Sequence, residues 1–408
     1  MADETQSLNL PAAGAGTPNG NYKVANVPKI SYQDPASVQT TYAWNTPVDF
    51  ILSRNLGKVL DMVLQIDVTV SNNGDLSNNV HFPPVPFWFE RLETSLGGSA
   101  PIETVNKDEL FLETLMYLPL QDFQTISDTV NINYDGSFRS SEPTQAIRTG
   151  RYFLPLWSNC LNTAQLYVKG FNADWKLRFY LSNGQPNMKV TGTGSTVSVS
   201  GLRLLVTEAQ LPNNVETTLA AKHSSGIIYN TVNRVRHLDT NMPTSTSSIK
   251  EYQLTTFANE SAGIVSYFRD AETNFKNLGK RVPLSTIQFR DANSNPYYAT
   301  DIDGAYNLYY IAPWSISSMP LGGENKLCKE NYLIPFSAHV GAVLESGKDL
   351  GAYQLSGREK VCLQPAALPG AVFGEGSAPI FVAISYDYMR IKVKHGNAKV
   401  FYNRGESR

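Results

Sequence analysis

The two halves of this sequence repeat one pattern of strands and turns. Residues 88–102 and 283–297 each alternate apolar and polar side chains, pass through a turn of small residues, and resume after a proline. At one constant offset, Leu92 falls opposite Ile287. Alternation with a period of two predicts strands, and small residues between two strands predict a hairpin. The sequence therefore predicts an all-β domain that occurs twice.

Further matches follow the hairpin in the same order. Residues 153–156 and 333–336 each hold a proline between apolar residues, and residues 201–206 and 380–386 each form an apolar strand pattern. Short helices are expected directly after the hairpin in both halves, near Asp108 and Asp303. Strands dominate and helices are few, so we predict two tandem eight-stranded jelly rolls, which is an all-β fold.

The chain of 408 residues is long enough for two domains of about 180 residues, each with its own core. Residues 1–35 are rich in small residues and predict a flexible, extended N-terminal arm. Residues 36–212 are assigned to the first jelly roll, and residues 250–408 to the second, with a basic C-terminal segment. The polar residues 213–249 between them are expected to be a connector.

The composition excludes some classes of function. The formal net charge is −2, so no overall positive field attracts nucleic acid, and we expect no direct nucleic-acid binding. Only 17% of residues are charged, while 21 Tyr and 18 Phe are present. Few charges together with many aromatic residues are typical of a protein whose surface is covered by neighbouring subunits. An ordinary Tyr-rich β protein has the same composition.

The cysteines and the N-terminus point to synthesis in a reducing cytosol. Cys160, Cys328 and Cys362 are too few and too scattered for a disulfide framework or a zinc site, so we expect them to pack as small apolar groups. The N-terminus has no basic, apolar pattern of a signal peptide. No apolar run approaches the ~18 residues of a membrane span.

No arrangement of residues predicts catalysis. The five histidines lie far apart, and residues 341–348 have the wrong spacing for a phosphate-binding loop. The carboxylates Asp108–Glu109 and Asp301/Asp303 could serve a glycosidase across a cleft. They are explained more simply as favourable charges at helix N-termini. We therefore predict no enzyme activity, no metal and no cofactor.

The sequence resembles the double jelly-roll major capsid proteins, in particular those of tectivirus-like bacteriophages with an internal membrane. The resemblance covers about residues 35 to 395 and includes strand and turn patterns in both halves. These patterns lie at residues 50–73, 87–103, 284–293, 299–303 and 383–388. The family has no catalytic residues that could be transferred to this chain.

This resemblance implies a homotrimer whose six jelly rolls make a pseudo-hexagonal tile of an icosahedral virion shell. The strands would stand roughly normal to the shell, and the loops between them would form towers on its outside. Implied partners are neighbouring trimers, other capsid proteins at the vertices, and an internal membrane. Two alternatives remain open: a minor capsid or spike protein of a similar virus, and a double jelly-roll glycan-processing enzyme or lectin.

The C-terminal segment is locally basic. From Tyr386 onward six Lys or Arg stand against two acidic residues, which is a local excess of +4. Strand alternation puts Arg390, Lys392 and Lys394 on one face, and Lys399 follows. One interpretation is an edge strand whose lysines discourage pairing with other chains. The other is a surface at the base of the tile that faces an anionic membrane.

Overall fold

The computed structural model describes residues 28–402 apart from ten short stretches, and we restrict the description to these residues. The stretches left out are 72–79, 83–84, 118–138, 142–146, 183–188, 191–195, 271–276, 278–279, 317–329 and 348.

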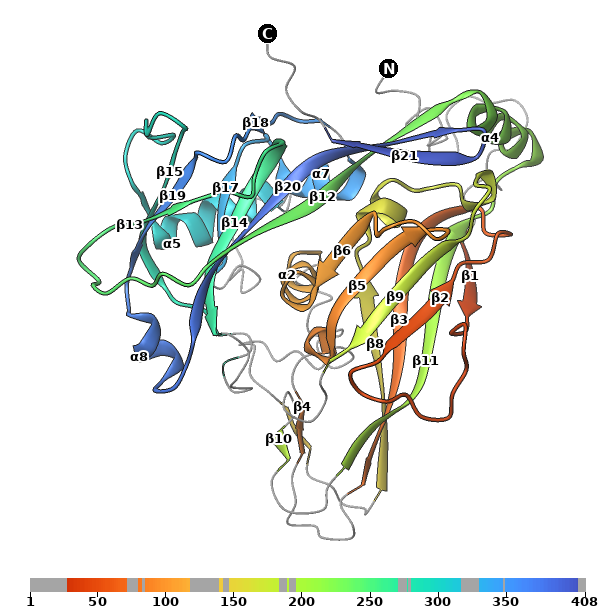
Figure 1. The fold of residues 1–408 in the computed structure, drawn as a ribbon, viewed down its shortest axis with the longest axis horizontal. Coiled ribbons are helices and arrows are strands. Elements are labelled where there is room, and N and C mark those ends of the chain that lie inside the picture. Colours follow the sequence, from red (N-terminus) through yellow and green to blue (C-terminus); the bar gives the residue numbers. More distant parts are fainter. Residues whose placement is uncertain are drawn as a thin grey trace.

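The first jelly roll consists of two four-stranded antiparallel sheets (Figure 1). One sheet has the order β1-β11-β3-β8, and the other has the order β2-β9-β5-β6. The strands are β1 (Pro28–Gln33), β2 (Pro47–Ile51), β3 (Lys58–Ser71), β5 (Phe89–Leu96), β6 (Glu103–Asn106), β8 (Ile147–Leu156), β9 (Trp175–Leu181) and β11 (Thr196–Ala209).

The second jelly roll repeats this topology strand for strand. Its sheets have the orders β12-β20-β14-β17 and β13-β19-β15-β16. The strands are β12 (Ile227–Asp239), β13 (Lys250–Gln253), β14 (Glu260–Asp270), β15 (Leu284–Arg290), β16 (Ile302–Asp303), β17 (Tyr332–Pro335), β19 (Lys360–Pro365) and β20 (Pro379–Lys394). The prediction of two eight-stranded jelly rolls is therefore confirmed.

The hairpin that revealed the duplication occupies equivalent strands. Leu92 in β5 pairs with Val105 in β6, and Ile287 in β15 pairs with Ile302 in β16. The proline motifs at 153–156 and 333–336 likewise end the equivalent strands β8 and β17.

Five further strands extend or connect the sheets. β18 (Tyr353–Gln354) pairs with β14, and β21 (Asn397–Tyr402) pairs with β20. The short strands β4 (Val80–Phe82), β7 (Arg139–Ser141) and β10 (Lys189–Val190) lie between the main strands of the first jelly roll and form a small sheet, β10-β4-β7. In Figure 1, β4 and β10 lie at the end of the molecule opposite to β21.

Both expected helices are present directly after the hairpins. α2 (Lys107–Tyr117) has Asp108 and Glu109 in its first turn. The second helical stretch consists of α5 (Gly304–Tyr306), a π-helical turn η7 (Asn307–Ile311) and α6 (Ala312–Ile316). Asp303 caps its start by accepting a hydrogen bond from the backbone N–H of Tyr306 at 3.0 Å.

The remaining helical elements are α4 (Asn213–Ser225), α7 (Val340–Ser346), α8 (Pro369–Phe373) and the short turns η2 (Val85–Trp88), η3 (Asn159–Thr163) and η4 (Val168–Gly170). No helix in the described ranges is long and apolar enough to cross a membrane.

Two segments differ from the sequence-based division. β1 lies inside residues 1–35, which the sequence predicts to be a flexible arm, and it pairs with β11. β12 lies inside residues 213–249, the expected connector, and pairs with β20 over its whole length. The sequence does not predict β12 because polar residues interrupt its apolar pattern. One of them, Arg234, has its partner Glu113 on the other jelly roll.

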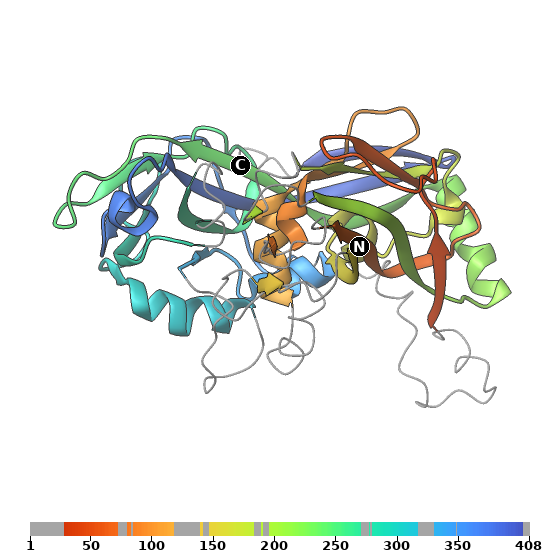
Figure 2. The same cartoon turned by 90° about the horizontal axis from the view of Figure 1, so that it is seen from below.

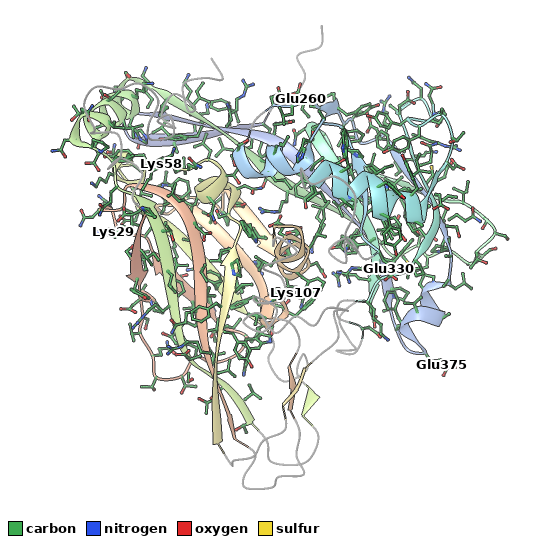
Figure 3. The ribbon with its side chains drawn as sticks, turned by 180° about the vertical axis from the view of Figure 1, so that it is seen from behind. Lys29, Lys58, Lys107, Glu260, Glu330 and Glu375 are labelled. Carbon is green, nitrogen blue, oxygen red and sulfur yellow. The ribbon has the colours of Figure 1, made fainter. Side chains whose placement is uncertain are left out.

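The two jelly rolls pack closely against each other. α2 lies between them (Figure 2). Figure 3 shows Lys107 at the start of α2, where its Nζ lies 3.0 Å from a carboxylate oxygen of Glu90 in β5. Leu112 of α2 is buried in one cluster with Val232 of β12 and Tyr386 of β20. The far end of β20 reaches back and packs into the core of the first jelly roll.

Candidate assembly and membrane-facing surface

The predicted basic residues lie together on a three-stranded ribbon. We name the basic ribbon the strand segments 227–231 of β12, 389–394 of β20 and 397–402 of β21. Arg390, Lys392 and Lys394 are exposed, while the alternating residues between them are buried. Those buried residues, Met389, Ile391 and Val393, belong to the core of the first jelly roll. The ribbon is thus fixed on its apolar face and open on its basic face.

Strand register brings Lys399 into the same surface. Lys392 pairs with Lys399 on one side and with Ile228 on the other. Arg390 pairs with Phe401 of β21. Ile228 is 44% exposed and Phe401 is 41% exposed, so apolar side chains stand beside the basic ones.

The sequence reasoning missed β21 and these two apolar residues. The sequence signal for this hairpin is Gly396, which follows His395 between two strand-like segments. In the structure both residues have positive φ, at 51° and 71°. Two consecutive residues of this conformation form the tight turn that joins antiparallel strands. The partner strand β21 extends the basic face beyond β20 by placing Lys399 beside Lys392.

The ribbon does not fit the interpretation of a protected edge. Arg390, Lys392 and Lys394 stand on β20, which is hydrogen-bonded to β12 on one side and to β21 on the other. Only Lys399 stands on an outer strand. Within the described part of the chain, none of these four residues forms an ion pair with an acidic side chain. Their charge is therefore directed outward rather than used to hold the sheet together.

Solved structures share this architecture over nearly the whole chain. PBCV-1 VP54, fitted into a reconstruction of the Sputnik virophage, has 14% identity and a TM-score of 0.67, with 92% of this chain and 97% of that chain covered. The Faustovirus major capsid protein has 10% identity and a TM-score of 0.62, with 94% and 92% covered. The mavirus major capsid protein has 11% identity and a TM-score of 0.51, with 97% and 94% covered. No family model and no curated protein matches the sequence.

This chain has the double jelly-roll fold of viral capsid proteins. At such low identity the likeness establishes the fold, and the function is argued separately below.

The residues considered for chemistry in this double jelly roll have structural partners. Asp108 pairs with Arg269 of β14 at 2.8 Å, and Asp303 caps α5. His223 lies 2.6 Å from the hydroxyl of Tyr229, and His339 accepts from the backbone N–H of Ala342. Across the described ranges, no three His, Cys, Asp or Glu side chains are grouped as metal ligands.

Two of the three cysteines fit the expected role. Cys160 and Cys362 are buried and free, and burial raises the pKa of both thiols. A buried thiol with a raised pKa is a poor nucleophile, so these side chains act as packing groups. Cys328 lies outside the described residues.

A buried charge cluster joins the two jelly rolls. Arg234 of β12 donates to both carboxylate oxygens of Glu113 on α2 and also pairs with Glu103. Burial raises the pKa of Glu113 to about 7, and Arg234 opposes that rise. Burial, with smaller contributions from the nearby carboxylates of Glu109 and Glu103, thus brings the pKa of Glu113 into the neutral range despite its ion pair with Arg234.

Proposed function

We propose that this protein is a viral major capsid protein whose homotrimers form pseudo-hexagonal tiles of an icosahedral virion shell. The observation that carries the proposal is the duplication, in which both halves have the same eight-strand order. Three copies of a duplicated domain offer six similar edges, which suits a hexagonal lattice. Three solved capsid proteins have the same fold over more than nine-tenths of this chain, which supports the assignment.

The partners follow from the same proposal. A trimer would contact neighbouring trimers along its edges, and other capsid proteins would occupy the vertices of the shell. The small sheet β10-β4-β7, built from segments between the main strands, would point outward, since it lies at the opposite end from the basic ribbon (Figure 1). We expect no catalytic turnover, because assembly needs only shape and surface.

The basic ribbon would face an internal membrane at the base of the tile. Arg390, Lys392, Lys394 and Lys399 project from one face, and Phe401 stands among them. Each basic group near an anionic surface contributes about 1 kcal/mol, and an aromatic side chain adds contact at the lipid interface. The contribution multiplies over the many trimers of a shell.

A narrower proposal concerns the virus. The sequence patterns quoted above favour tectivirus-like bacteriophages, whereas the structural likeness extends to PBCV-1, Faustovirus and mavirus proteins. The lineage therefore stays a prediction based on the sequence alone.

The test of the proposed function is the mass and shape of the purified protein. One chain has a mass of 45.0 kDa, so light scattering should give three times this value at micromolar concentration. Negative-stain microscopy should show particles with a hexagonal outline. A monomer at micromolar concentration contradicts the proposal, because obligate interfaces of this kind bury thousands of Å2.

A further inference from the structure

The contact between the two jelly rolls has two sides, a helix and a sheet. The helix side is α2, where Leu112 and Glu113 are 2% and 0% exposed. The sheet side includes Val232 and Arg234 of β12. Leu112 packs in one cluster with Val232, and Glu113 pairs with Arg234. Because both domains have the same topology, each side of this contact has a counterpart elsewhere in the chain.

The counterpart of the helix side is the stretch from α5 to α6. Both helices begin directly after the equivalent strands β6 and β16, at Lys107 and Gly304. Counted from these starts, the sixth and seventh residues are Leu112 and Glu113 in the first copy. In the second copy they are Tyr309 and Tyr310.

These counterparts on the second helix are exposed. Tyr309 and Tyr310 are 60% and 50% exposed, and Tyr306 and Trp314 on the same stretch are 51% and 65% exposed. Tyr306 and Tyr310 stack with their ring centroids 5.2 Å apart. Figure 2 shows this helical stretch along the periphery of the second jelly roll, whereas α2 is enclosed between the two domains. Four large aromatic side chains on one exposed helix are typical of a binding surface.

The counterpart of the sheet side lies on β1, as the strand register shows. The proline motifs make Leu64 of β3 equivalent to Ile264 of β14. Leu64 pairs with Leu204, which pairs with Gln33 of β1.

In the second sheet Ile264 pairs with Ser385, which pairs with Val235 of β12. Gln33 is therefore equivalent to Val235. Counting back along both strands makes Tyr32 the counterpart of Arg234, and Ile30 the counterpart of Val232.

These sheet residues are exposed as well. Tyr32 and Ile30 are 60% and 59% exposed, while Arg234 and Val232 are 6% and 0% exposed. Figure 3 shows Lys29 of β1 on the side of the first jelly roll that points away from the second. The chain thus carries one occupied helix–sheet contact and two open surfaces that correspond to its two sides.

We propose that the aromatic helix of one copy, α5 to α6, docks on the β1 face of a neighbouring copy. Tyr310 then lies beside the partner's Tyr32, and Tyr309 lies beside the partner's Ile30, just as Glu113 lies beside Arg234 within the chain. This inference rests on the proposed function, because it describes how the trimer closes. A head-to-tail contact that repeats the internal one closes a ring of six domains after three chains.

The chemistry of the two surfaces supports the contact. Within the chain, a buried ion pair is made during folding and always has its partner. Between chains, each surface must stay soluble until it meets the other, and aromatic side chains tolerate water while burying a large area on docking. An unpaired Glu and Arg at these positions would have lost more hydration on assembly.

The test replaces the proposed aromatic contact between two copies by an ion pair like the one within the chain. In the full chain, Tyr310→Glu should raise the concentration at which trimers dissociate by about 30-fold or more, as expected for an aromatic residue at the centre of an interface. Adding Tyr32→Arg to the same chain should restore most of the loss, because the two residues recreate the Glu113–Arg234 pair. Phe401→Glu, which replaces a similarly exposed aromatic residue on the basic ribbon, is the matched control and should leave the trimer intact.

The outcomes separate this inference from the proposed function. A parent protein that is monomeric contradicts both. A parent trimer together with a trimeric Tyr310→Glu variant overturns the helix contact alone and leaves the capsid proposal standing. Circular dichroism should show that the variant is folded; if it is not, Tyr309→Ser with Trp314→Ser gives the same test. If the variant stays trimeric but loses binding to glycan arrays, the aromatic helix is a sugar-stacking surface and our inference is wrong.

Discussion

The sheets β1-β11-β3-β8 and β12-β20-β14-β17 have equivalent strand orders but differently covered outer faces. In β14 every residue from Ser261 to Asp270 is buried. In the equivalent strand β3, burial alternates, with Leu64 buried and Val63 half-buried. The outer face of the second sheet is covered by α7 and α6 of its own jelly roll together with Leu112 of α2. Among the described residues, no residue of α5 to α8 joins the core of the first jelly roll. If the chain forms the proposed trimer, we expect the next subunit to bind where the face of the sheet is open.

Buried ion pairs also hold α2 against the second sheet, and removing them gives the prediction with the largest effect. Arg234→Ala leaves Glu103 and Glu113 buried without their guanidinium. We expect a loss of about 3–5 kcal/mol in the free energy of unfolding. Arg203→Ala is the matched control on the first sheet, where Arg203 pairs with Asp34 in a largely exposed bridge. It should cost about 1 kcal/mol or less. Urea unfolding of both variants measures the contrast, and equal losses would contradict it.

The equivalent helix positions give a second contrast. Leu112→Ala removes a side chain from the contact between the domains and should destabilise the chain by about 2–5 kcal/mol. Tyr309→Ala removes an exposed side chain at the matching position, and the unfolding of the single chain should change by about 0.5 kcal/mol or less. The measurement is the thermal unfolding of dissociated chains, followed by circular dichroism. A larger loss of stability for Tyr309→Ala than for Leu112→Ala would contradict the prediction.

A third prediction concerns pH, since the contact between α2 and the second sheet holds two buried carboxylates, Glu103 and Glu113. Burial raises the pKa of Glu113 from 4.5 to about 7 in the folded chain. The folded chain therefore holds this proton more tightly than the unfolded chain does, so the contribution to stability is present below pH 4.5 and is lost as the pH rises through 7. The change is up to about 3 kcal/mol. Glu113→Gln should flatten this part of the profile between pH 5 and pH 8, and an unchanged slope in urea titrations would show that Glu113 does not titrate there.

Much of the fold could be predicted from the sequence because it depends on local alternation. Residues close together in the sequence are enough to predict the repeated hairpin, the two helix starts and the alternation at 389–394. Period-two burial needs no knowledge of distant contacts. The same local signals gave the four basic residues of the ribbon.

The rest could not be predicted because it depends on distant partners. β12 contains Arg234, whose partner Glu113 lies 121 residues away in the sequence, so its polar residues look like those of a loop. Tyr309 and Tyr310 lie in the helix expected near Asp303, and their exposure follows from the structure and not from the sequence pattern. The width of the basic ribbon likewise required the pairing of β20 with β21.

The last prediction compares the basic ribbon with exposed basic residues elsewhere on the molecule. Lys392→Glu with Lys394→Glu reverses two charges on the exposed face of the basic ribbon, while the buried residues beside them stay in place. We expect a loss of at least about 2 kcal/mol in binding to anionic vesicles, roughly 30-fold, from the two lost basic groups, and the added carboxylates increase it. Lys280→Glu with Arg358→Glu makes the same change in charge at exposed positions outside the ribbon. That control should bind vesicles nearly as well as the parent, which a sedimentation assay with phosphatidylserine-containing vesicles would measure. Both variants should remain trimeric. If they bind equally well, the ribbon does not face a membrane, and its lysines serve only to keep this end of the tile soluble.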